Sequence, residues 1–213
     1  MKIIVARYNE DITWTKLFSS NVLIYNKGQR LDEPNVINLN NVGREGHTYF
    51  HHIYNNYDNL DDYLVFVQGK PFDHSPNIIK SLLNFQKQIN KNHKNLNQNQ
   101  NQIGFRYLSE KIIKANLFYC PHHPGLPLEK TFKELFPEIV LNENNIANHK
   151  FCFGSGAQFI VSKSRIKQRP REFYLKIVQM LEKEPNPIEG FVIERFHALI
   201  FSANEEECLS PLY

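Results

Sequence analysis

Short apolar runs alternate with amphipathic segments along the first third of the chain. The runs share a length of four or five residues and a polar or glycine-containing turn at their ends. They occupy residues 3–6, 22–25, 36–39 and 63–67, with apolar residues at helical spacing between them at 14–18 and 44–56. Such runs are typical of strands that are buried on both faces. The alternation predicts an α/β fold: a single-domain, three-layer sandwich in which helices flank a mostly parallel central sheet.

The later segments complete this picture. Residues 84–102, NFQKQINKNHKNLNQNQNQ, have few apolar side chains, so we expect an Asn- and Gln-rich insert that does not pack. The pattern predicts a helix over 131–136, a glycine turn leading into a buried strand over 151–162, and helices over 171–184 and 189–201. The last helix is apolar on nearly every side, and we therefore expect it to be buried.

Composition narrows the class of protein. The 213 residues are 41% hydrophobic, which is enough for a core and typical of one domain, 1–213. The net charge of +3 is too small to indicate nucleic acid as a partner. No apolar run approaches the ~18 residues of a membrane span, and the apolar N-terminal stretch is too short for a signal peptide. The cysteines, Cys120, Cys152 and Cys208, form no CxxC motif, so we expect a soluble protein of the cytoplasm or another reducing compartment.

The first candidate site is the polar turn that follows the first predicted strand. Ligands of open α/β sheets bind at the carboxyl ends of the strands. Arg7 could therefore contact a phosphate, and Asn9, Glu10 and Asp11 a base or ribose. The alternative is an ordinary turn in which Asp11 or Thr13 caps the next helix. The chain has neither GxGxxG nor GxxxxGK[ST], so it lacks the Rossmann fingerprint and the P-loop.

The second candidate is the start of the helix predicted over 44–56. A helix N-terminus with a nearby arginine, here Arg44, is a ready anion site, although Arg44 and Glu45 could equally form a solvated pair. His47 and His51 have the spacing of a zinc-binding pair on one helix face, but the motif is not HExxH. The alternative for these two histidines is ordinary packing.

The third candidate is QGKPFDHSP, residues 68–76, directly after the fourth predicted strand. A carboxylate and an imidazole, Asp73 and His74, suit Mn²⁺ or Mg²⁺ when phosphate oxygens complete the shell. Asp73 could instead cap the helix that begins near Pro76. The segment CPHH at 120–123 resembles part of a metal site, but prolines mark it as a loop without further ligands at matching spacing.

The fourth candidate joins a glycine turn to the last helix. Gly154, Ser155 and Gly156 offer backbone N–H groups that could line an acceptor pocket, or they simply make a sharp turn. On the helix, Glu194 and His197 share a face. A buried carboxylate has a raised pKa that suits a general base, whereas the alternative is a structural ion pair of Glu194 with Arg195 or His197.

Six blocks of the chain carry a family resemblance. They are VARYNEDITW, IYNKG, LNNVGREGHTYFHHIYNNYD, DDYLVFVQGKPFDH, FGSGAQFIVSKSRI and ERFHALIF. In this order they resemble domain of unknown function 3431, a family whose layout is similar to that of GT-A-fold glycosyltransferases. In those enzymes the first-strand turn contacts the nucleotide, the fourth strand ends at a metal and diphosphate motif, and a later glycine turn with its helix forms the acceptor site.

The resemblance implies roles for individual residues. It implies donor binding by Arg7, Asn9, Glu10, Arg44 and Gln68, and a metal at Asp73 and His74, where such enzymes carry DxD. It implies acceptor binding by the turn from Gly154 to Ala157 and by His197, with Glu194, or less favourably Glu189, as the base. DxD itself is missing, since Asp61 and Asp62 precede the strand. Three alternatives follow: Asp73 and His74 hold a metal in another geometry, sugar transfer has been lost, or cationic side chains neutralise the diphosphate without metal. The cations in question are Arg7, Arg44 and Lys70.

These inferences converge on one functional expectation. The chain is expected to move a sugar from a nucleotide-sugar to a glycan or protein acceptor, with Mn²⁺ or Mg²⁺ as the only candidate cofactors and no organic cofactor. The alternatives are a non-catalytic nucleotide- or carbohydrate-binding module on the same fold, and a metal-dependent hydrolase built on His47, His51 and His74. The first reading requires that the loops carrying Asn9 and Asp73 converge on one cleft.

Overall fold

A computed structural model of the chain describes residues 1–94, 103–142 and 145–210. Within these residues, a six-stranded sheet has the order β3-β2-β1-β4-β8-β5. The strands are β1 (Lys2–Arg7), β2 (Val22–Asn26), β3 (Val36–Asn38), β4 (Tyr63–Gln68), β5 (Phe105–Tyr107) and β8 (Phe159–Ser162). The first four are mutually parallel, and β8 runs antiparallel to both β4 and β5. The predicted mixed fold with a mostly parallel central sheet is confirmed.

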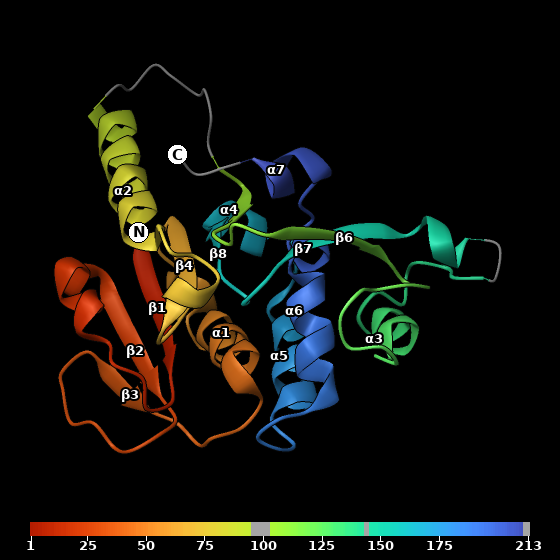
Figure 1. The fold of residues 1–213 in the computed structure, drawn as a ribbon, viewed down its shortest axis with the longest axis horizontal. Coiled ribbons are helices and arrows are strands. Elements are labelled where there is room, and N and C mark those ends of the chain that lie inside the picture. Colours follow the sequence, from red (N-terminus) through yellow and green to blue (C-terminus); the bar gives the residue numbers. More distant parts are fainter. Residues whose placement is uncertain (95–102, 143–144, 211–213) are drawn as a thin grey trace.

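A second, two-stranded sheet extends from the main body (Figure 1). It pairs β6 (Ile112–Asn116) with β7 (Lys150–Gly154) in antiparallel fashion. Two short connections join it to the main sheet: one runs from Tyr107 at the end of β5 to Ile112 at the start of β6, and the other from Gly154 at the end of β7 to Phe159 at the start of β8.

The helices divide between the two faces of the main sheet. Alternate residues of β1 and β4 enter different hydrophobic clusters: Ile3 and Val65 pack on one face, and Ile4 and Phe66 on the other. The first face is covered by the 3₁₀ segment η1 (Thr13–Asn21) and by α2 (Ile78–Lys94), and the second by α1 (Arg44–Asn55), α5 (Arg171–Leu181) and α6 (Ile188–Ile200). Burial on both faces explains why these strands read as continuous apolar runs.

Three further helices also contribute buried residues to the larger hydrophobic cluster. They are α3 (Leu128–Leu135), α4 (Lys163–Ile166) and α7 (Glu205–Leu209). Within the described residues, no helix has the length and apolar character needed to cross a membrane.

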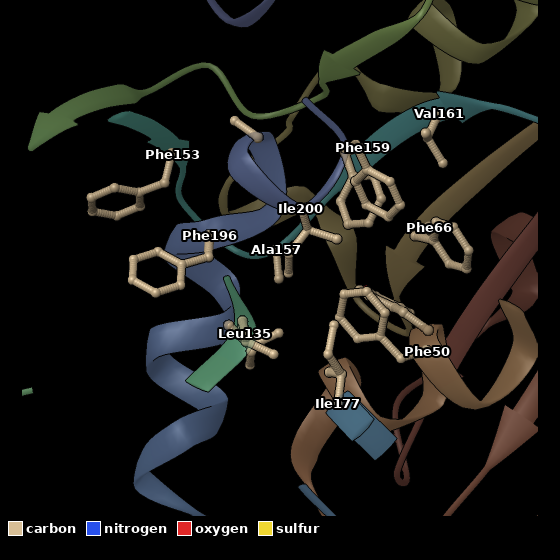
Figure 2. Close-up of a cluster of buried hydrophobic side chains, with 14 of the residues drawn as sticks. Phe50, Phe66, Leu135, Phe153, Ala157, Phe159, Val161, Ile177, Phe196 and Ile200 are labelled. Atoms are coloured by element: carbon tan, nitrogen blue, oxygen red, sulfur yellow. The ribbon is translucent and has the colours of Figure 1, made fainter. Parts of the chain in front are cut away.

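Aromatic side chains dominate the larger core (Figure 2). The fully buried ring of Phe159 on β8 lies 5.1 Å from that of Phe66 on β4 and 5.4 Å from that of Phe201, which follows α6. Phe196 of α6 packs edge-on against Phe151 of β7. Phe159 therefore joins the main sheet to α6, the helix that carries Glu194.

Several predicted elements differ from the structure. The segment over 14–18 is 3₁₀ rather than α-helical, and the helix predicted over 131–136 begins at Leu128. Residues 84–94 of the predicted insert continue α2, because Phe85 is buried against the sheet. The expectation of an unpacked insert is thus wrong at Phe85 and Ile89, which pack in the smaller hydrophobic cluster, while the side chains of 92–94 and all of 95–102 lie outside the described residues.

The order of the strands creates one special position. From β1 the chain proceeds to β2 and β3 on one side and then returns to β4 on the other side of β1. Ala6 and Gln68, near the carboxyl ends of β1 and β4, are paired across this point. Open α/β sheets bind ligands in the crevice at such a reversal of strand order.

Replacing Phe159 with alanine tests the central packing. We expect Phe159→Ala to lower the free energy of unfolding by about 3–5 kcal/mol because it leaves a cavity among fully buried rings. The matched control Phe118→Ala, at a side chain that is 78% exposed, should change it by less than about 0.5 kcal/mol. Urea unfolding measures both, and equal effects of the two variants would contradict this packing.

A candidate active-site cleft at the carboxyl ends of β1 and β4

Two adjoining cavities lie at the carboxyl ends of β1 and β4. The first, the β1 lobe, has a volume of about 530 Å³ and includes Arg7, Glu10 and Lys70 in its lining. The second, the α6 lobe, has a volume of about 590 Å³ and includes His74, Gly156 and Glu194. Both lobes are lined by Arg44, Glu45, Gln68 and Asp73. We call the two lobes together the cleft.

The turn after β1 is held by hydrogen bonds from side chains within the turn. The Arg7 guanidinium donates to Asn26 Oδ1 at 2.6 Å and to the backbone oxygens of Tyr8 and Glu10. Glu10 Oε2 accepts from the Tyr8 N–H at 2.6 Å. Arg7 and Glu10 line the β1 lobe, while the Nε and Nη1 atoms of Arg7 donate the hydrogen bonds that shape the turn.

Asn9 faces away from the cleft. Its Oδ1 accepts from the Gln29 N–H at 2.8 Å, and Asn9 is not among the residues that line either lobe. The predicted donor contact of Asn9 is therefore not supported by its position. The loops after β1 and β4 do meet, because Gly69 packs against Glu10 so closely that an added Cβ would lie 2.7 Å from Glu10 Oε2.

The start of α1 contributes a side chain rather than free amides. Gly43 and Arg44 both have left-handed backbones, with φ of +61° and +51°. Their N–H groups donate to the carbonyl oxygens of Glu184 and Pro185, so these two amides are not available to an anion. The predicted anion site at this helix end therefore depends on the Arg44 guanidinium.

The Arg44 guanidinium is held by neighbours in the cleft. It lies 4.2 Å from the centroid of the Phe191 ring and donates to Asn186 Oδ1 at 3.0 Å. Its Nε is 3.8 Å from a Glu45 carboxylate oxygen. Because Arg44 lines both lobes, a cation stands at their junction.

Glu194 is the carboxylate of the α6 lobe. Its Oε1 accepts from the Gly156 N–H at 3.1 Å, and its Oε2 lies 3.3 Å from the Arg195 guanidinium. Burial, followed by repulsion from Glu45, raises the pKa of Glu194, while Arg195, the Gly156 N–H and Arg44 oppose the shift. Glu194 therefore pairs with Arg195 and also lines the cleft, whereas its use as a general base stays a prediction.

Only the middle of the glycine turn, Ser155 and Gly156, reaches the cleft. Gly156 has φ of +83°, and a Cβ there would lie 2.4 Å from the His74 ring, so only glycine allows this contact. Ser155 and Gly156 line the α6 lobe. Gly154 instead packs against the Tyr107 ring, and Ala157 is buried in the core, so neither supports the expected acceptor contact.

The residues at the predicted metal position do not make a metal centre by themselves. Asp73 and His74 line the α6 lobe, but Asp73 is exposed and its Oδ1 lies 3.3 Å from Lys70 Nζ. Across residues 1–94, 103–142 and 145–210, no group of three or more His, Cys, Asp or Glu side chains could share a metal ion. The donor set therefore does not fit a resident Mn²⁺ or Mg²⁺ held by protein ligands alone.

Residues 3–212 match the model of the family described as "Protein of unknown function (DUF3431)". The chain belongs to this family. No curated protein matches the sequence.

In this DUF3431 protein, the cleft is also lined by residues that the sequence analysis did not assign to it. His122 and His123, from the CPHH loop, line the α6 lobe together with Glu110 and Lys111. The His123 ring packs against the Phe191 ring in a tilted arrangement, with 4.6 Å between centroids. The signal in the sequence was a pair of histidines, but nothing in their spacing pointed to α6.

His197 lies in the core of the DUF3431 fold and not in the cleft. It is fully buried, its ring is 4.5 Å from that of Phe159, and neither ring nitrogen has a hydrogen-bond partner in the described part of the chain. The predicted acceptor contact is therefore wrong. Glu194 and His197 are three positions apart on α6, yet His197 packs against Phe159 in the core whereas Glu194 lines the α6 lobe.

His47 and His51 do not form a zinc site either. Their rings lie 5.5 Å apart, but burial and then Lys27 lower the pKa of His47 to about 3. In the described part of the chain, no third His, Cys, Asp or Glu side chain joins them in a group that could hold a metal ion. Glu189, the second candidate base, lines neither lobe.

His197 generates a prediction for acid stability. Burial lowers the pKa of His197 to about 3, so the neutral ring's contribution to stability is present above pH 6.5 and is lost as the pH falls toward 3. The loss amounts to about 4 kcal/mol at pH 3. We expect His197→Phe, which keeps a ring and removes the unpartnered nitrogens, to flatten this part of the pH–stability curve and to raise stability at pH 7 by about 1–3 kcal/mol. Curves that run parallel for the two proteins in urea unfolding would contradict this assignment.

Proposed function

We propose that the protein is a glycosyltransferase that moves a sugar from a nucleotide-sugar to a hydroxyl group of a glycan or protein acceptor. The observation that carries the proposal is Glu194, a carboxylate with a raised pKa that is oriented by the Gly156 N–H and lines a cleft where the strand order reverses. The segments that line the cleft occur along the chain in the order implied by the GT-A resemblance: the turn after β1, the end of β4, the glycine turn and α6. The GT-A-like layout is part of this proposal.

In the proposal, the diphosphate of the donor occupies the β1 lobe. Negative charge develops on this leaving group when the bond to the sugar breaks, so positioned cations stabilise the transition state. Arg44 at the junction and Lys70 in the β1 lobe supply that charge. No step is assigned to a metal.

Glu194 acts as the base in the α6 lobe. Its carboxylate takes the proton of the acceptor hydroxyl, the hydroxyl oxygen bonds to the anomeric carbon, and the bond from that carbon to the diphosphate breaks with its electron pair leaving on the diphosphate. The raised pKa of Glu194 makes the carboxylate a better proton acceptor than an exposed glutamate. The proposed reaction inverts the anomeric configuration.

Glu194→Gln tests the base. The amide keeps an oxygen for the Gly156 N–H but cannot accept the proton, so we expect sugar transfer to fall by about 10²–10⁴-fold with donor affinity unchanged. Glu189→Gln, on the same helix but outside both lobes, is the matched control and should keep full activity. The assay follows nucleoside diphosphate release across a panel of nucleotide-sugars and acceptors. Full transfer by Glu194→Gln would remove the base, and binding of a donor without turnover by the unmodified protein would favour the non-catalytic module.

Arg44→Ala tests the diphosphate subsite. Loss of a charge-assisted contact should weaken binding of UDP or GDP, whichever the unmodified protein binds, by about 10–100-fold. Arg30→Ala is the control, because the Arg30 side chain is exposed, pairs with Asp32 and does not line the cleft. Calorimetry in EDTA and in Mn²⁺ measures both variants. Equal affinities for Arg44→Ala and the unmodified protein would exclude Arg44 from this role.

A further inference from the structure

Lys27 is a buried lysine directly after β2. Only 8% of the residue is exposed, although its side chain reaches the β1 lobe. Its Nζ donates to the carbonyl oxygen of Val42 at 2.5 Å and to that of Arg44 at 2.6 Å. The lysine therefore ties the end of β2 to the beginning of α1.

The two carbonyls flank the left-handed turn that carries Arg44. A left-handed backbone is unfavourable for a residue with a Cβ and persists only where surrounding contacts impose it. Gly43 and Arg44 are held from one side by hydrogen bonds of their N–H groups to Glu184 and Pro185. Lys27 holds the same turn from the other side through its carbonyls.

We infer that Lys27 is a positioning residue that holds the Gly43–Arg44 turn so that the Arg44 guanidinium stands at the junction of the two lobes. Through Arg44, it governs the affinity of the cleft for a nucleoside diphosphate. This second part rests on the proposed function, whereas the clamp on the turn does not.

The surroundings of Lys27 make the clamp sensitive to pH. The charged or titratable groups near it are Arg44, Glu45, His47 and His51 of α1, together with Arg7, whose backbone oxygen accepts from the Lys27 N–H. Burial lowers the pKa of Lys27 to about 7, and Glu45 opposes the shift. An ammonium donates stronger hydrogen bonds than an amine, so the clamp weakens as the pH rises through about 7.

Amide hydrogen exchange tests the clamp without any ligand. Lys27→Met keeps the aliphatic stem and removes the donor, and we expect it to speed exchange of the Gly43 and Arg44 amides by about tenfold or more at pH 7. Lys16→Met, at an exposed lysine on η1, is the control and should leave these rates unchanged. Unchanged rates in Lys27→Met would overturn the inference. If Lys27→Met does not fold, Lys27→Gln, which retains an amide donor, should give a smaller acceleration in the same direction.

Nucleotide affinity tests the positioning role. We expect the advantage of the unmodified protein over Lys27→Met in binding UDP or GDP to be about tenfold or more at pH 6 and to shrink as the pH rises from 6 to 9. A difference that stays constant over this range, or no difference, would overturn the positioning role even if exchange is accelerated. If the unmodified protein binds neither nucleotide, the proposed function fails, and accelerated exchange would still support the clamp.

Discussion

The pairing of β1 with both β2 and β4 is the constraint on which the cleft depends. Because parallel strands on either side of β1 end at the same edge, the turns after β1 and β4 must meet there, as Glu10 and Gly69 do. Trp14 strengthens this meeting point, since its Nε1 donates to the Gly69 carbonyl oxygen at 2.9 Å from within the core. The hydrophobic contacts that hold the sheet therefore also fix the position of the cleft.

The α6 helix carries core side chains and a residue that lines the cleft on one short segment. Phe196 and His197 face the aromatic core, whereas Glu194 lines the cleft one turn away. A carboxylate that is only 15% exposed would be unfavourable without partners, and the Gly156 N–H and Arg195 provide them. The same helix thus keeps this carboxylate partly desolvated beside its partners, and burial is the main cause of the raised pKa of Glu194.

The sequence predicted those parts of the fold whose pattern is local. The buried strands β1, β2 and β4 and the helices α1, α5 and α6 were recognisable because their apolar residues follow strand or helix periodicity. The strands β5 and β6 were missed because they are short and include polar residues such as Arg106 and Lys114. The direction in which a side chain points was harder to predict from the sequence. Asn9 and His197 were assigned to the site, yet tertiary packing turns Asn9 toward Gln29 and His197 into the core. Lys27 lies in the block IYNKG, but that block gave no signal of the residue's role, because the role arises only when the end of β2 is brought beside α1.

A crystal structure of the protein with a bound nucleoside diphosphate from the donor panel tests the central claim most directly. We expect its phosphates in the β1 lobe, within hydrogen-bond distance of the Arg44 guanidinium, with the terminal phosphate directed toward the α6 lobe and Glu194. A nucleotide bound in another part of the molecule, such as the cavity of about 370 Å³ beside Cys152 and Cys208, would contradict the claim, and so would a protein that binds none of these nucleotides.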